Sequence, residues 1–130
     1  YTGIKQNKNF LIPKIISHFK SNKEYITLGD IDVFRDFSDV RDVARAYKEI
    51  LFSNSKDIFF NVCSGKSISI QEILSILSKF SNHEIKIRQS EEFKREKINK
   101  RISGDNSLLK SIGWNPKYKI EDTLLWMLNN

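Results

Sequence analysis

A length of 130 residues suffices for one domain with a hydrophobic core and is too short for two. The composition, 39% hydrophobic and 29% charged, is that of a globular protein, and no apolar run approaches the roughly 20 residues of a membrane span. A net charge of +6 would suit a polyanion, but the lysines are scattered instead of clustered, so we expect neither a nucleic-acid nor a membrane partner.

The cysteine content and the first residues predict a cellular location. Cys63 is the single cysteine, so it cannot form an internal disulfide, and it suits a reducing compartment. Tyr1–Asn9 is polar and lacks the apolar core of a signal peptide. We therefore expect a cytoplasmic protein.

The first half of the chain predicts two helices and two strands. Phe10–Phe19 has apolar residues at helical spacing, and its proline lies in a first turn, where proline is tolerated. Tyr25–Leu28 and Val33–Phe37 are strand candidates, the second with an arginine inside it. Val40–Leu51 has one apolar face and is a predicted helix, and either Ser38 or Asp39 can cap its N-terminus.

The second half predicts further strands and helices. Ile58–Val62 is an apolar run of strand length. Ser69 and Glu72 match the S-x-x-E capping box in front of a helix that reaches Phe80. Glu84–Arg88 alternates as a half-buried strand would. An irregular charged stretch and two short helices follow at Ser90–Lys100, Ser107–Ile112 and Glu121–Leu128. This mixed order, with few and short strands, predicts part of an α/β fold.

No cofactor loop can be assembled from the glycines. Gly65-Lys66-Ser67 has the end of a phosphate loop, but Phe60 occupies the place of its first glycine. The five glycines are also too far apart for G-x-G-x-x-G. We therefore expect no cofactor-binding residue in this chain.

A catalytic pair and a metal site are likewise not expected. Tyr1 and Lys5 have Y-x-x-x-K spacing, but Gly3 and the polar residues that follow make a poor helix, on which such a pair would depend. His18 and His83 lack metal-ligand spacing to each other or to the cysteine.

Arg35 is the residue that most needs an explanation. An arginine in the middle of an apolar strand costs desolvation unless an anion meets it, and a guanidinium can grip a phosphate through paired hydrogen bonds. An internal salt bridge to Asp36 or Asp42 would also justify it. The pattern by itself leaves both explanations open.

Several short motifs together resemble one family, the extended short-chain dehydrogenase/reductases that act on nucleotide sugars, also called the NAD-dependent epimerase/dehydratase family. Arg35-Asp36-Phe37-Ser38-Asp39-Val40-Arg41-Asp42 resembles its R-D-[FWY]-x-x-V-x-D signature. Four further segments resemble family motifs in the right order: Tyr1-Thr2-Gly3, Asn9–Ile15, Phe60–Gly65 and Gly113-Trp114-Asn115-Pro116. The resemblance implies that residues 1–130 form the nucleotide-sugar-binding C-terminal segment of a Rossmann-type fold whose N-terminal half is absent.

Within this family the chain is most similar to reductases of GDP-4-keto-6-deoxy-D-mannose, and next to GDP-mannose 4,6-dehydratases. Gly29-Asp30-Ile31-Asp32 resembles the G-N-L-D of GDP-binding members, and Phe37-Ser38-Asp39-Val40 departs from the dehydratase pattern toward the reductases. The resemblance therefore implies a GDP-sugar substrate.

The resemblance also assigns roles to single residues. Arg35 corresponds to an arginine that contacts the nucleotide phosphates, Lys14 to a second cation at the same pyrophosphate, and Asn9 to a residue lining that pocket. Arg95, nine residues before Gly104, corresponds to the arginine of an R-P-x-[DE] segment, although Glu96 and Ile98 replace the proline and the acid.

The cofactor glycines and the catalytic residues of the family belong to the missing half. The intact parent is expected to use NADP or NAD, to pair this chain with its N-terminal Rossmann half, and to be a homodimer, whereas this chain alone should bind no cofactor. A dehydratase or another nucleotide-sugar epimerase/dehydratase is the alternative parent, and a noncatalytic nucleotide-binding module is the alternative from another class.

Overall fold

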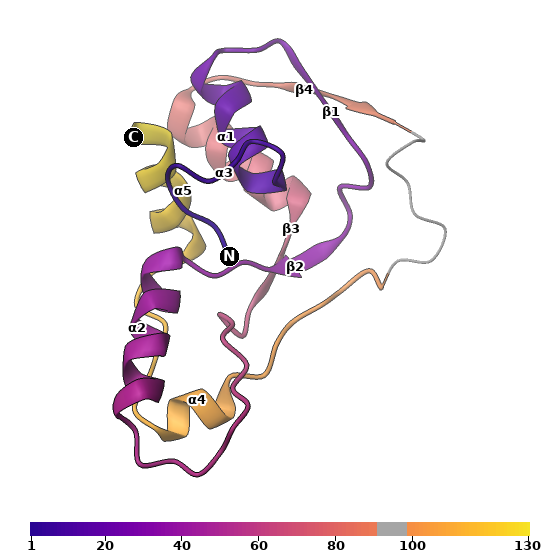
Figure 1. Ribbon diagram of the computed structural model, residues 1–130. Helices are drawn as coiled ribbons and strands as arrows, with labels where there is room; N and C mark the ends of the chain where they lie inside the picture. The colour runs from indigo at the N-terminus through magenta and orange to yellow at the C-terminus, as the bar shows by residue number, and fades with distance from the viewer. Residues whose placement is uncertain (91–98) are drawn as a thin grey trace.

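The computed structural model describes residues 1–90 and 99–130. Nine helices and strands are defined in these ranges, in the order drawn in Figure 1. They are α1 (Leu11–Lys20), β1 (Tyr25–Leu28), β2 (Phe34–Asp36), α2 (Val40–Phe52), β3 (Ser67–Ser69), α3 (Ile70–Ser81), β4 (Lys86–Gln89), α4 (Ser107–Ser111) and α5 (Ile120–Asn129).

Three helices build the main hydrophobic core. α1 contacts α3, α5 and β1, and α3 contacts α5, so the upper part of the molecule is a helical layer with β1 against it (Figure 1). Apolar residues spaced three or four positions apart on each helix face this centre. Its most buried members are Ile12, Ile15, Phe19, Ile26, Ile70, Ile73, Leu77 and Leu124.

The ends of the helices follow local sequence signals. Phe10 is the N-cap of α1, and Pro13 is accommodated in the first turn of that helix. The side chain of Ser69 accepts a hydrogen bond from the Glu72 amide, and Glu72 accepts one from the Ser69 amide, which confirms the predicted capping box of α3. Asn82, in the left-handed conformation with φ of 50°, ends α3.

Two small sheets connect these helices. β1 and β4 pair in parallel, with Tyr25 opposite Lys86, and β2 pairs antiparallel with β3, with Arg35 opposite Ile68. Residues 100–102 run along the other edge of β2: the Phe34 amide donates to the Lys100 carbonyl at 2.6 Å, and the Ile102 amide donates to the Phe34 carbonyl at 3.1 Å. β2 is thus flanked on both edges.

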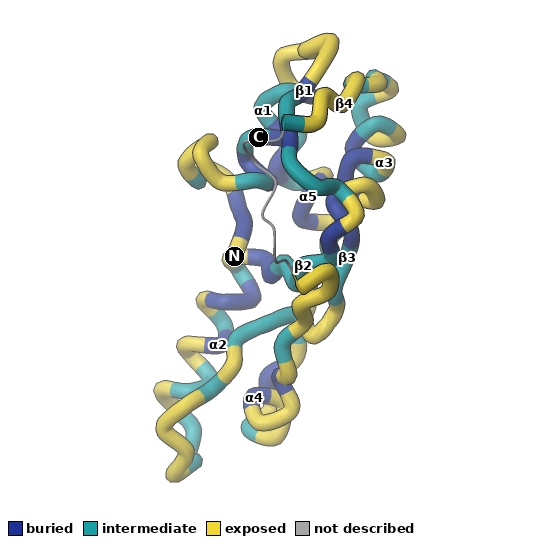
Figure 2. Tube along the Cα trace, turned by 90° about the vertical axis from the view of Figure 1, so that its right-hand side faces the viewer, coloured by how far each residue is buried: buried dark blue, intermediate teal, exposed yellow. Residues whose placement is uncertain are grey.

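A second, smaller cluster lies in the lower part of the molecule. Ala46 of α2, Leu109 of α4 and Trp114 are almost completely buried there. The Trp114 indole nitrogen donates to the Asp42 carbonyl at 3.0 Å, which satisfies the one polar group of that ring. In Figure 2 α2 lies on one side of this part and α4 on the other, and the connecting chain is largely exposed.

Most of the predicted elements are confirmed within one or two residues, and two predictions are wrong. Ile58–Val62 forms no strand, because this run has no partner strand among the described residues. Glu84–Arg88 is not a half-buried strand: the strand begins two residues later, at Lys86, and all four of its residues are exposed. β3 was not foreseen, and the predicted irregular stretch Ser90–Lys100 lies mostly outside the described residues.

None of the helices in residues 1–90 and 99–130 has the length and hydrophobicity required to cross a lipid bilayer.

Candidate functional site

Arg35 lies on β2 and is held by backbone oxygens. Its Nη1 donates to the carbonyls of Phe34 at 2.7 Å, Asn99 at 3.1 Å and Lys100 at 3.4 Å. No ion pair joins Arg35 to Asp36 or Asp42 within the part of the chain that the structure describes, so the predicted alternative of an internal salt bridge is wrong. Nε and Nη2 make no hydrogen bond to any described residue, and these donors are free to meet an anion.

Asp36, the next residue, fixes two later loops. Its Oδ1 accepts hydrogen bonds from the Ser64 amide at 2.9 Å and from the Ser64 hydroxyl, and its Oδ2 accepts from the amides of Gly65 at 2.9 Å and Gly104 at 3.2 Å. One carboxylate thereby joins β2, the turn at 63–66 and the segment 99–104. Because the carbonyls that orient Arg35 belong to residues 99 and 100, Asp36 indirectly supports the position of Arg35.

Asp39 is the N-cap of α2 and the centre of a buried polar contact. It accepts from the Arg41 amide at 2.7 Å, from the Arg41 guanidinium at two points, and from the Thr123 hydroxyl at 2.7 Å. Burial raises the pKa of the Asp39 carboxyl group, but the hydrogen bonds from Arg41 and Thr123 outweigh burial, and its pKa lies below the ordinary value. The carboxyl group therefore stays ionised at neutral pH.

The Arg41 guanidinium is enclosed by two aromatic rings. It lies 3.7 Å from the ring centroid of Tyr118 and 3.8 Å from that of Trp126. Its hydrogen bonds to Asp39 raise the pKa of the guanidinium further above neutral pH. This arginine of the signature joins the start of α2 to α5 through Asp39 and Trp126.

Asp42 joins α2 to the segment before α5. Its Oδ2 accepts from the amides of Lys117 and Tyr118, both at 2.9 Å, and its Oδ1 accepts from Arg45 at 2.6 Å. Asp42 is only 2% exposed, so these bonds satisfy a charge that would otherwise be costly to bury.

The three aspartates of the signature thus organise the second half of the chain. Sequence reasoning singled out the arginine of this stretch and named Asp39, beside Ser38, as a candidate helix cap, which the structure confirms. It missed the roles of Asp36 and Asp42. A cap position before a helix was the available signal for Asp39. Nothing in the sequence pattern linked Asp36 to Gly104, which is 68 residues away.

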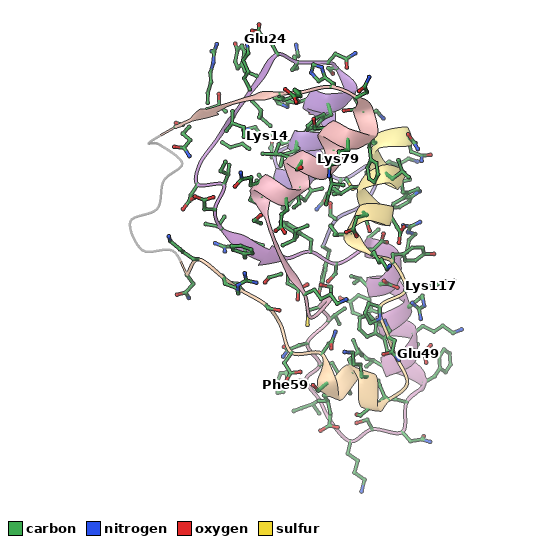
Figure 3. The ribbon with its side chains drawn as sticks, turned by 180° about the vertical axis from the view of Figure 1, so that it is seen from behind. Lys14, Glu24, Glu49, Phe59, Lys79 and Lys117 are labelled. Carbon is green, nitrogen blue, oxygen red and sulfur yellow. The ribbon has the colours of Figure 1, made fainter. Side chains whose placement is uncertain are left out.

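Lys14 and Asn9, the other two predicted ligands that the structure describes, lie at the start of α1. The Lys14 ammonium donates to the Thr27 carbonyl at 2.8 Å, and Figure 3 labels this side chain on α1. Asn9 is exposed, and its amide donates to the Asn7 side chain at 2.9 Å. Lys14 is therefore placed by β1, and Asn9 by the loop before the helix.

Arg95, the fourth predicted ligand, lies outside the described residues. Its neighbours in sequence are described from Asn99 onward, and the carbonyls of residues 99 and 100 contact Arg35. Residues 99 and 100 therefore lie directly beside Arg35.

Gly29–Asp32, the stretch that resembles the GDP-binding motif, leads from β1 to β2. The Asp32 amide donates to the Asp30 carboxylate at 2.9 Å, which forms a tight local turn. The carbonyls of Ile31 and Val33 accept from the first amides of α3 at 3.3 Å. The turn is thereby fixed against the N-terminus of α3.

Two pockets among the described residues do not coincide with the predicted ligands. One of about 580 Å³ lies between the first loop, α1 and the end of α5, and one of about 550 Å³ lies between β3 and the start of α5. Asn9, Lys14 and Arg35 line neither of these two. In the part that the structure describes, no group of three or more His, Cys, Asp or Glu residues could hold a metal ion.

Comparison with known proteins identifies the family. The model of a family described as GDP-mannose 4,6 dehydratase matches residues 2–127. The chain belongs to this family, whose solved relatives have the epimerase and short-chain dehydrogenase fold of the Rossmann type, and it has the mixed α/β character predicted from its sequence.

Two curated proteins are similar to most of this chain. The GDP-6-deoxy-D-talose 4-dehydrogenase of Aggregatibacter actinomycetemcomitans is 33% identical over 85% of this chain and 37% of its own length. The GDP-6-deoxy-D-mannose reductase of Pseudomonas aeruginosa is 34% identical over 81% of this chain and 35% of its own length. The chain thus spans little more than a third of each relative.

A solved structure agrees with these matches. RMD from Pseudomonas aeruginosa, complexed with NADPH, superimposes with a TM-score of 0.86 and 32% identity, over 98% of this chain and 44% of that protein. The relative with the same fold thus binds a nicotinamide cofactor.

Proposed function

We propose that this chain is the nucleotide-sugar-binding C-terminal segment of an NAD(P)-dependent enzyme that reduces GDP-4-keto-6-deoxymannose to GDP-rhamnose. The observation that carries the proposal is the pair of curated relatives, since both are named as redox enzymes of a GDP-linked 6-deoxyhexose. Both match this chain at 33% identity or more.

The geometry of Arg35 supports a phosphate-binding role. Backbone carbonyls fix one end of its guanidinium, so less conformational freedom is lost when the other end binds an anion. Neither Asp36 nor Asp42 competes for it, because other donors satisfy both carboxylates. Lys14 would add a second positive charge, and Asn9 and Arg95 would complete the donors around the diphosphate.

The turn at residues 63–66 does not fit the phosphates of a dinucleotide. A phosphate loop needs backbone amides that point at the phosphates, but the amides of Ser64 and Gly65 donate to the Asp36 carboxylate instead. We propose that the cofactor, NADP or NAD, is held by an N-terminal Rossmann half of a longer, homodimeric cytoplasmic protein. That half would also supply the catalytic groups, and this chain would bind and orient the GDP-sugar.

A GDP-mannose 4,6-dehydratase is the second candidate for the parent. The observation that favours it is the family model, which carries that description and matches residues 2–127. A nucleotide-binding module without catalysis is the candidate from another class, and it would share the Arg35 site.

Calorimetric titration with nucleotides and nucleotide sugars tests the proposal. The protein to use is the native polypeptide, which means the protein at the full length at which it occurs naturally. We expect GDP to bind more tightly than UDP, and NADPH to be oxidised when GDP-4-keto-6-deoxymannose is added. Conversion of GDP-mannose without added NADPH would favour the dehydratase, and GDP binding without either reaction would favour the noncatalytic module. Equal affinity for GDP and UDP would contradict the assignment of guanine.

A further inference from the structure

A pocket of about 580 Å³ lies between residues 3–8, α1 and the C-terminal end of α5, and it is called the α1 pocket below. Figure 1 shows these parts together, with the indigo N-terminal loop and the yellow α5 next to α1. The volume falls within the roughly 300 to 1,000 Å³ of small-molecule sites. Lys14 and Arg35 do not line this pocket, so it is distinct from the residues predicted to bind the nucleotide sugar.

The loop that forms one wall of the α1 pocket is fixed at both ends. Thr2 is 2% exposed, and its hydroxyl donates to the sulfur of Met127 on α5 at 3.5 Å. At the other end the Phe10 amide donates to the Asn7 carbonyl at 3.1 Å. The wall is therefore ordered without a ligand, which reduces the conformational entropy that binding would cost.

The lining of the α1 pocket is positively charged. Lys5, Lys8 and Lys20 line it, and none of the described lining residues is an aspartate or a glutamate. The ammonium groups of these three lysines form no hydrogen bond or ion pair with any described residue. Positive charges without a counter-charge in a concave site attract an anion. A phosphate monoester, with a charge of about −1.5 to −2 at pH 7, matches them.

The backbone of Lys5 is in a conformation that its side chain disfavours. Its φ is 62°, in the left-handed region that residues other than glycine rarely adopt. Glycine would adopt this conformation without steric cost. Strain of this kind is concentrated at ligand-binding loops, where the side chain itself is required. The lysine at this position is therefore better explained by its charge than by the local fold.

The α1 pocket also contains a buried acceptor that needs a donor. Gln6 Oε1 is buried and has no hydrogen-bond partner among the described residues, an arrangement that costs free energy unless a ligand or water supplies a donor. The Ser17 hydroxyl donates to the Lys14 carbonyl at 3.0 Å, so its oxygen is left to accept a second bond. Both acceptors suit the hydroxyl groups of a ligand.

The remaining lining favours a sugar over a nucleoside. Ile16 and Met127 offer apolar surface to the carbon atoms of a ligand. None of the described residues that line the pocket is aromatic, so a nucleobase would find no ring to stack on. A phosphate, several hydroxyl groups and no base describe a sugar phosphate.

We propose that the α1 pocket is a second binding site of this protein and takes a phosphorylated sugar. The phosphate binds at Lys5, Lys8 and Lys20, and a sugar hydroxyl donates to Gln6 Oε1. This inference does not depend on the proposed function, because it concerns other residues and another ligand.

Calorimetric titration of the native polypeptide with glucose 1-phosphate tests the proposal. We expect saturable binding with a Kd below about 1 mM, and weaker binding of inorganic phosphate and of glucose, since each supplies only part of the contacts. No saturation at about 10 mM glucose 1-phosphate, or equal affinity for inorganic phosphate, would overturn the proposal. Displacement of glucose 1-phosphate by GDP would also overturn it, because the pocket would then belong to the nucleotide-sugar site. Failure of GDP to bind would refute only the proposed function.

Charge substitutions locate the phosphate. Lys5→Gly and Lys8→Ala should each weaken the binding of glucose 1-phosphate by about threefold or more. Lys5→Gly should not lower the unfolding midpoint, because glycine suits a φ of 62°. Lys79→Ala is the matched control, since Lys79 is exposed on α3 and does not line the pocket (Figure 3). Equal affinities of the Lys5→Gly, Lys79→Ala and unaltered proteins would contradict the proposal.

Gln6→Leu locates the sugar. It removes the buried acceptor, so it should weaken the binding of glucose 1-phosphate and leave the affinity for inorganic phosphate unchanged. Unchanged affinity for glucose 1-phosphate would contradict the hydroxyl contact, and an equal loss for both ligands would show that the sugar does not meet Gln6. Either result would overturn the assignment of a sugar phosphate.

Discussion

Arg41 and Asp39 form a two-point ion pair at the start of α2, with Nε 2.9 Å from Oδ1 and Nη2 2.7 Å from Oδ2. The Asp39 side chain is completely buried, whereas that of Arg41 is 31% exposed. Because Thr123 of α5 donates to the same carboxylate, the pair joins α2 to the main core.

Arg41→Ala should destabilise the fold markedly. It leaves the Asp39 carboxylate buried without its partner and removes the cation from between Tyr118 and Trp126. We expect the free energy of unfolding, measured by urea denaturation, to fall by about 2 to 4 kcal/mol. This is less than the usual cost of breaking a buried ion pair, because Arg41 is partly exposed to solvent. The exposed Lys48→Ala on the same helix should change it by less than about 0.5 kcal/mol. A loss that small for Arg41→Ala would contradict the role of the pair.

The lowered pKa of Asp39 predicts an acid-dependent loss of stability. The folded state holds the carboxyl group ionised at a pH where the unfolded state already binds a proton, so protonation favours unfolding. The contribution is fully present above the ordinary aspartate pKa of about 4 and disappears as the pH falls through the lower folded value. Unfolding midpoints from pH 7 to pH 2 should fall less steeply for Asp39→Asn than for the unaltered chain. Parallel curves for both proteins would contradict this assignment.

Gly104 should not tolerate a side chain. A Cβ atom there would lie 2.5 Å from Cys63 Sγ and 2.8 Å from Cys63 Cβ, so Gly104→Ala must displace the turn that Asp36 holds. Overpacking of this kind costs about 1 to 3 kcal/mol. Cys63→Ala removes only the contact with sulfur, so the double variant should recover part of the loss and not all of it. A double-mutant cycle in urea denaturation measures this coupling, and additive effects would rule it out.

Arg35→Ala should weaken GDP binding by the native polypeptide and leave the fold intact. A charge-assisted hydrogen bond contributes about 1.5 to 3 kcal/mol, which corresponds to a roughly ten-fold to more than hundred-fold increase in Kd. Arg35→Lys should restore only part of the affinity, because an ammonium group cannot make the planar two-point contact. Calorimetry gives the affinity and thermal unfolding the stability. Unchanged affinity with a large loss of stability would contradict phosphate binding.

The 130-residue chain alone should not oxidise NADPH in the presence of GDP-4-keto-6-deoxymannose. Hydride transfer requires the cofactor to be held against the sugar, and no dinucleotide motif exists in this sequence. The nicotinamide absorbance of NADPH, followed over time with increasing amounts of purified chain, measures this oxidation. Loss of absorbance that scales with the amount of chain would contradict the prediction.

Local patterns predicted most elements of the fold. Helical spacing of apolar residues and the Ser69 capping box located α1, α2 and α3 within one or two residues, because helix signals depend on neighbours a few positions apart. The strand prediction for Ile58–Val62 was wrong because a strand, unlike a helix, also requires a partner strand, and this run has none among the described residues.

The sequence by itself determined the fold class, the family resemblance and the candidate ligands Asn9, Lys14, Arg35 and Arg95, because motifs are read from residues close together in the chain. Only the tertiary structure excluded the internal salt bridge of Arg35 to Asp36 or Asp42, and the phosphate-binding role stays a prediction. The carbonyls that hold it belong to residues 99 and 100, and the donors that occupy Asp36 belong to residues 64, 65 and 104. Contacts between residues so far apart in the sequence arise from packing, so the local pattern of charges around Arg35 does not predict them.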